Sequence, residues 1–182
     1  RKGIQVFIIA PLKGHEFYRA ARNVGGEFIQ ISPASKNCIN IMEIRKVDNS
    51  VNELLDGPTL DASALAGKIQ RLHIFFSLLI PDMSHEEKQL LDEALIKTYA
   101  RKGITHKNES LTDPQHPEQY KKMPILEDVY NVLLESEDTK RLAHILNRLV
   151  HGSASSFNQQ TNVDLTNKYT VLDISELTGS SD

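Results

Sequence analysis

The sequence predicts an α/β protein in which a partial sheet is interrupted by an inserted all-α subdomain. Three apolar segments are expected to be strands, near residues 4–9, 27–32 and 168–174. Between the second and the third, the spacing of apolar residues becomes helical over roughly 90 residues. We therefore expect four parts along the chain: an α/β part at 1–45, a linker at 46–60, a helical subdomain at 61–152 and a return to the sheet at 153–182.

The N-terminal part has the order strand, turn, helix, strand. Residues 4–9 carry apolar side chains on both faces, which is typical of a strand covered by helices on both sides. A helix is expected from His15 to Val24, because Gly25 and Gly26 provide a strong stop. This order is typical of nucleotide-binding α/β proteins. The phosphate-loop pattern G-x-x-x-x-G-K-[ST] occurs nowhere in the 182 residues, so we expect a piece whose catalytic loops lie outside it.

The first helix of the inserted part is predicted to begin after Asp61 and to end at Ile80. Asp61 is a suitable N-cap, and Pro81 stops the helix. Phe75 and Phe76 are adjacent, so one of them is expected to point off the apolar stripe, where it could dock on a partner. The simpler alternative is that the apolar stripe is the core of the insert itself.

Further helices of the insert are marked by the residues at their ends. Ser84 and Glu87 form a capping box for a helix that Gly103 ends. Pro124 suits the first turn of the next helix, and Asp138 is expected to cap the last one. The insert is therefore predicted to contain four helices.

Composition and charge narrow the classes of function. Hydrophobic residues make up 40% of the chain and charged residues 25%, as in ordinary globular proteins. The net charge of −3 argues against a broad nucleic-acid-binding surface, although a local basic patch is compatible with it. A single cysteine, Cys38, cannot form an internal disulfide, which favours a reducing compartment. The longest apolar run is far shorter than the roughly 20 residues that a membrane-spanning helix needs.

The turn after the first strand holds the candidates for a nucleotide-proximal site. Lys13, His15 and Glu16 follow the carboxyl end of that strand, where open α/β sheets bind ligands. They are expected to lie near a nucleotide or a neighbouring subunit. The alternative is an exposed polar turn, in which Glu16 favours the helix N-terminus.

Two asparagines mark the place where the chain enters the helical subdomain. Asn37 and Asn40 flank Cys38, and loop asparagines commonly bond to nearby backbone groups. We expect both to hold this crossover, and Cys38 to be a small buried hydrophobe rather than a nucleophile. No metal site is expected, because His85-Glu86-Glu87 has Gln89 where a zinc-binding helix needs a second histidine.

Several segments, taken in order, carry a resemblance to a known family. They are 6–17, 25–33, 37–44, 152–157 and 161–165, followed by the strand that ends at Asp173. Together they resemble the C-terminal motor domain of conjugative-transfer (type IV secretion) ATPases, in particular those from Gram-positive mobile elements. The resemblance spans nearly the whole chain.

The resemblance implies a partial RecA-like P-loop sheet and a parent protein that binds ATP and Mg²⁺. It places the phosphate loop before Arg1 and the acidic Walker B strand after Asp182. Catalysis of phosphoryl transfer depends on those parts, so no catalytic residue is expected here and the isolated segment is predicted to be inactive and to need no cofactor. The implied partners are the other motor subunits of a hexamer and secretion-channel proteins at the inner face of the membrane. Direct DNA binding is left open.

Two other functions remain open on the sequence. One is a non-enzymatic helical protein-interaction module of a transfer or secretion apparatus. The other is a small α/β enzyme, which ranks last because no nucleophile and base stand at a readable spacing. The implied location is cytoplasmic, with peripheral attachment to the membrane through the transfer apparatus.

Overall fold

The computed structural model describes residues 6–10, 27–31, 36–45, 63–152, 154–163 and 168–173. The chain divides into two compact units. The first joins Arg1–Asn40 to Arg148–Asp182, and the second is Ile41–Asn147.

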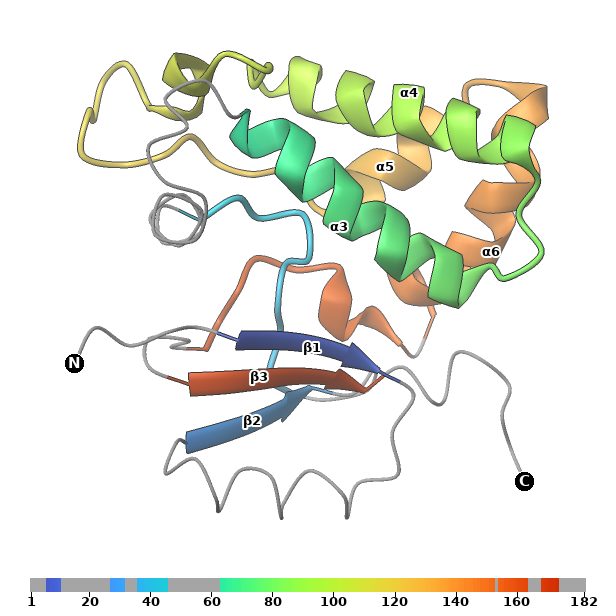
Figure 1. Cartoon of the computed structure of the whole chain (residues 1–182), viewed down its shortest axis with the longest axis horizontal. Helices are drawn as coiled ribbons and strands as arrows, with labels where there is room; N and C mark the ends of the chain where they lie inside the picture. The colour runs from blue at the N-terminus through green and yellow to red at the C-terminus, as the bar shows by residue number, and fades with distance from the viewer. Residues whose placement is uncertain are drawn as a thin grey trace. The chain divides into compact units, whose positions relative to one another are not determined.

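The first unit contains a three-stranded parallel sheet (Figure 1). Its strands are β1 (Val6–Ala10), β2 (Glu27–Ile31) and β3 (Lys168–Asp173). β3 lies between the other two, with Ile8 opposite Val171 and Ile29 opposite Thr170. The three strands overlap the three segments that the sequence predicted to be extended.

The predicted fold class was nevertheless wrong. Side-chain burial is described for residues 36–45, 63–152 and 154–163. These segments are mostly helical and contain no strand, so a partial RecA-like sheet is not seen in them. An apolar segment of five or six residues indicates extended backbone, but it does not say how many strands share a sheet or which layers cover it. The described part of the chain is therefore a mostly helical protein.

Between β2 and β3, the described residues form four α-helices (Figure 1). They are α3 (Ala64–Leu79), α4 (His85–Arg101), α5 (Leu126–Leu133) and α6 (Lys140–Val150). Three short 3-10 helices accompany them: η1 (Asn108–Leu111), η2 (Glu137–Thr139) and η3 (Ser155–Phe157). α4 is central to the second unit, because it packs against α3, α5 and η2. The helix predicted for residues 15–24 lies outside the described residues.

The ends of the helices test the predicted caps. α4 has the predicted capping box, since the Ser84 hydroxyl accepts from the Glu87 N–H at 3.1 Å and Glu87 Oε1 accepts from the Ser84 N–H at 3.2 Å. Gly103 follows α4 with φ +76, a left-handed conformation that favours glycine. α3 ends at Leu79, one residue before the predicted end at Ile80, and the next helix, α4, begins after Pro81 as predicted.

Two predicted caps were wrong. The N-cap of α3 is Ser63, whose hydroxyl accepts from the Ala66 N–H at 3.1 Å, whereas Asp61 lies outside the described residues. Asp138 does not cap α6 but lies within η2, where its own N–H donates to the Ser136 hydroxyl at 3.3 Å. In both places a serine is the N-cap, of α3 at Ser63 and of η2 at Ser136. Serine and aspartate are similarly good N-caps, so residue type alone does not say which of two neighbouring candidates caps a helix.

The core of the second unit includes side chains from α3, α4 and α5. Phe75 and Phe76 are each only 1% exposed and meet edge to face, with ring centroids 5.5 Å apart. The expectation that one of them points off the core was therefore wrong, because α3 is covered over an arc wide enough to bury both. Tyr99 of α4 is fully buried, and its hydroxyl donates a hydrogen bond to the carbonyl of Met42.

Candidate functional site

The predicted nucleotide-proximal residues, Lys13, His15 and Glu16, lie outside the described residues. Their role near a nucleotide or a neighbouring subunit stays a prediction. Among the described residues, the two best-defined polar sites are a hydrogen-bonded crossover in the first unit and an ion-pair cluster in the second.

The crossover brings together two segments that are about 120 residues apart in the sequence, as the separation of Asn40 and Gln160 shows. We call residues 36–40 and 156–162 the crossover clasp; the first segment follows β2 along the chain and the second precedes β3 (Figure 1). Their backbones pair directly, because Ile39 N–H donates to the Ser156 carbonyl at 3.1 Å and Asn162 N–H donates to the Cys38 carbonyl at 3.1 Å.

Asn40 lies at the centre of this arrangement. It is only 2% exposed, and its side-chain amide donates to Gln160 Oε1 at 3.2 Å. Its backbone N–H donates to the Thr161 hydroxyl at 3.0 Å. Asn37, the other predicted crossover residue, is exposed. The structure thus gives Asn40 a buried bonding position, while a functional role for either asparagine stays a prediction.

Asn162 is a residue of the clasp that the sequence reasoning did not single out. Its side-chain oxygen accepts from the Cys38 N–H at 2.7 Å, and its side-chain nitrogen donates to the Lys36 carbonyl at 3.2 Å. One amide side chain therefore pairs with the backbone as a neighbouring strand would. A polar residue in a polar loop gives no signal of a partner more than 120 positions away.

Cys38 is buried within the clasp, at 6% exposure. Its sulfur lies 3.5 Å from Gln159 Oε1 and 3.7 Å from the Lys36 carbonyl oxygen, both of which accept the weak S–H donor. These contacts are those of a small buried side chain, and neither partner is a base that could activate a nucleophile.

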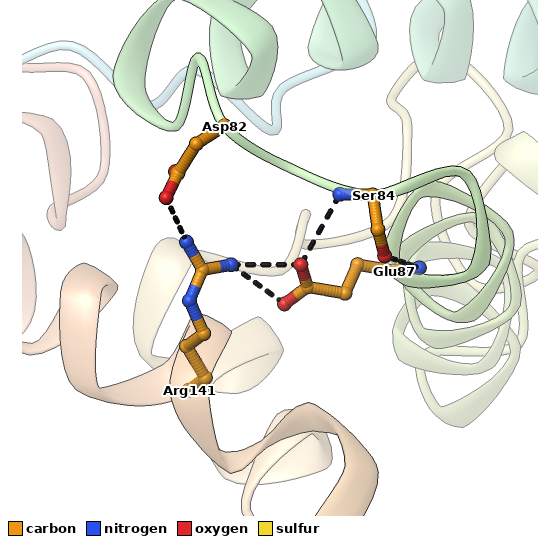
Figure 2. Close-up of polar contacts among 4 residues, drawn as sticks. All are labelled: Asp82, Ser84, Glu87 and Arg141. Atoms are coloured by element: carbon orange, nitrogen blue, oxygen red, sulfur yellow. Dashed lines mark hydrogen bonds and ion pairs between the residues drawn. The ribbon is translucent and has the colours of Figure 1, made fainter.

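The ion-pair cluster of the second unit ties the start of α4 to α6 (Figure 2). Arg141 Nη1 donates to both carboxylate oxygens of Glu87, at 2.7 and 2.8 Å, and Nη2 donates to Asp82 Oδ2 at 2.6 Å. Glu87 also completes the capping box with Ser84. The hydrogen bonds from Arg141 are the main reason that the pKa of Glu87 is lowered, and the hydrogen bond from the Ser84 backbone adds to this effect. The hydrogen bonds to Glu87 and Asp82 raise the pKa of Arg141.

A second charged cluster joins α4 to the turn after α5. Glu135 accepts from Lys97 at 2.8 Å and from Arg101 at 2.5 Å. Hydrogen bonds from Lys97 and then Arg101 lower the pKa of Glu135. Both clusters are exposed to solvent, so they are suited to fixing the helices against one another and to contacting charged partners, and neither resembles a buried catalytic centre.

Within the described residues there is no group of three or more histidine, cysteine, aspartate or glutamate side chains that could hold a metal ion. His85 is exposed at the start of α4. None of the helices in the described part is both long enough and apolar enough to cross a membrane.

Comparison with solved structures gives a likeness that bears on function. The structure is similar to that of VirB4 of Thermoanaerobacter pseudethanolicus, with a TM-score of 0.61 and 26% sequence identity over 97% of this chain. The chain spans 62% of the length of that VirB4 chain. No family model matches the sequence, and no curated protein does. The likeness to VirB4 supports the relationship to type IV secretion ATPases that the sequence motifs indicated.

Proposed function

We propose that this chain is a segment of a cytoplasmic ATPase that powers conjugative DNA transfer or type IV secretion. The observation that carries the proposal is the likeness to VirB4, which extends over 97% of the chain at 26% identity. The order of the motif segments along the chain supports it as well. The segment would lie between the Walker A and Walker B motifs of a protein of the Gram-positive mobile-element type.

In this proposal the helical unit supplies an interaction surface. Its exposed face carries charged clusters around Arg141 and Glu135, which are suited to contacts with other subunits of a hexamer or with secretion-channel proteins at the inner face of the membrane. Attachment to the membrane would be peripheral, through that apparatus. The parent would use ATP and Mg²⁺, whereas the isolated segment would need neither and would not hydrolyse ATP.

The test compares the protein encoded by the complete native reading frame with the 182-residue chain. We expect the longer protein to bind Mg-ATP and to hydrolyse it, and the shorter chain, at the same concentration, to do neither above background. The shorter chain is the matched control, because it contains every residue described above. A longer protein that binds no nucleotide would refute the ATPase and leave the non-enzymatic interaction module as the function.

A further inference from the structure

Three consecutive backbone N–H groups of the crossover clasp all donate to the same partner segment. Cys38 N–H reaches the Asn162 side chain, Ile39 N–H reaches the Ser156 carbonyl and Asn40 N–H reaches the Thr161 hydroxyl. In an ordinary strand pair successive N–H groups point in alternate directions, so only every second one faces a given neighbour. In the clasp, the side-chain oxygens of Asn162 and Thr161 accept from the N–H groups of Cys38 and Asn40, so all three N–H groups bond to one segment.

This arrangement couples the bonds to one another. Cys38, Ile39 and Asn40 are 6%, 3% and 2% exposed, so the closed clasp shields these residues from water. A buried N–H group without an acceptor is costly, and a partly opened clasp would leave one or more of them in that state. Separation of the two segments exposes all three groups to water together. The stable arrangements are therefore fully closed and fully open.

The bonds named for the clasp are also electrically neutral. Each joins a backbone group, an amide or a hydroxyl to another such group. Their strength does not depend on the ionisation of a side chain, and salt screens them little. In this the clasp differs from the cluster around Arg141, whose ion pairs weaken in salt and in acid.

We propose that the crossover clasp is a two-state conformational latch. In the closed state, which the structure shows, residues 36–40 and 156–162 hold together the two connections through which the chain leaves β2 and returns to β3. In the open state the segments separate as a unit and the Cys38 thiol reaches solvent. The latch goes beyond the proposed function and does not depend on it, because every contact that defines it lies within this chain.

The single cysteine of the chain makes opening measurable without labelling other sites. We would follow the reaction of Cys38 with a coloured thiol reagent, in the native 182-residue chain and in the same chain unfolded in denaturant. We expect the native thiol to react much more slowly than the unfolded one, at a rate that changes little between low and high salt.

Asn162→Ala removes two bonds of the latch and should raise the rate of the native thiol by about fivefold or more, since fivefold is the ratio that corresponds to the loss of about one net hydrogen bond. Asn131→Ala is the matched control, because Asn131 is an exposed asparagine on α5, and it should leave the rate unchanged. If Asn162→Ala does not fold, Gln160→Ala, which removes the Oε1 acceptor of the Asn40 side-chain amide, should also raise the rate.

Hydrogen exchange of the backbone amides supplies the second measurement. The N–H groups of Cys38, Ile39 and Asn40 should exchange with one common free energy of opening, and Asn162→Ala should lower it equally for all three. Three different opening free energies would overturn the latch. A native thiol that reacts as fast as the unfolded one would also overturn it, and so would Asn162→Ala and Gln160→Ala chains whose thiols react no faster than that of the wild type.

Discussion

The hydroxyl of Tyr99 offers the sharpest test of how the second unit is held together. It is the donor to the Met42 carbonyl, and it connects the segment 41–45 to the C-terminal end of α4. Tyr99→Phe keeps the ring and removes only the oxygen. Both residues are 0% exposed, so water does not replace the lost donor.

The expected cost follows from what the substitution leaves behind. The loss of a buried hydrogen bond costs about 1–3 kcal/mol, and the removed hydroxyl no longer has to be buried, which offsets part of that cost. We expect the free energy of unfolding to fall by about 1–2 kcal/mol. In a unit of this size the melting temperature should then fall by roughly 4–8 °C for each kcal/mol.

The assay is urea unfolding followed by far-ultraviolet circular dichroism, which reports the helices. Thr98→Val is the matched control, since the Thr98 hydroxyl is also buried and donates at 2.7 Å to the Ala94 carbonyl within the same helix. That carbonyl lies in the middle of α4, where it also accepts the helical N–H bond, so its loss should cost about half a kcal/mol or less. Equal effects of the two variants would refute the claim that Tyr99 holds the segment at Met42.

Three further predictions concern charge and backbone conformation. Burial raises the pKa of Tyr99, so Tyr99 should stay protonated in the folded chain at pH values where it ionises in the unfolded chain. Stability should therefore be full below the tyrosine's ordinary pKa of 10.0 and fall above it, which ultraviolet absorbance during alkaline unfolding would show. Arg141 lowers the pKa of Glu87, so the stability that this ion pair provides should be present above pH 4.5 and be lost as the pH falls below that value. Glu87→Gln should therefore make stability depend less on pH in acid unfolding, and a dependence as steep as that of the wild type would contradict the prediction. Gly103→Ala should cost about 1–2 kcal/mol in thermal unfolding, because φ +76 strains any residue with a Cβ; the nearest obstacle is the flexible end of Lys121, so a neutral result would mean that the turn relaxes.

Features written into a few neighbouring residues could be predicted from the sequence. The capping box of Ser84 and Glu87 is one, and the glycine stop at Gly103 is another, because each rests on the conformation that those residue types prefer. The positions of the three strands also followed from local apolar runs.

Features that depend on distant partners could not be predicted. Nothing in the sequence near Arg141 indicates that Asp82 and Glu87 accept from it, and nothing near Asn162 indicates that it pairs with Cys38. The fold class failed for the same reason, since a strand propensity does not say how large a sheet becomes or how much of the core the helices provide. The burial of both Phe75 and Phe76 likewise depends on neighbours that only the folded chain brings together.

The central position of β3 in the sheet has a consequence for folding during synthesis on the ribosome. β1 and β2 each pair with β3, which is made last, and the helices are translated in between. Domains generally fold as units while synthesis proceeds at about 5–20 residues per second, so the helical part can become structured while the first two strands still wait for their shared neighbour. Strand edges that have no partner yet are prone to pair with other chains. Chaperone protection of this nascent chain should therefore be needed most in the interval before Lys168 emerges.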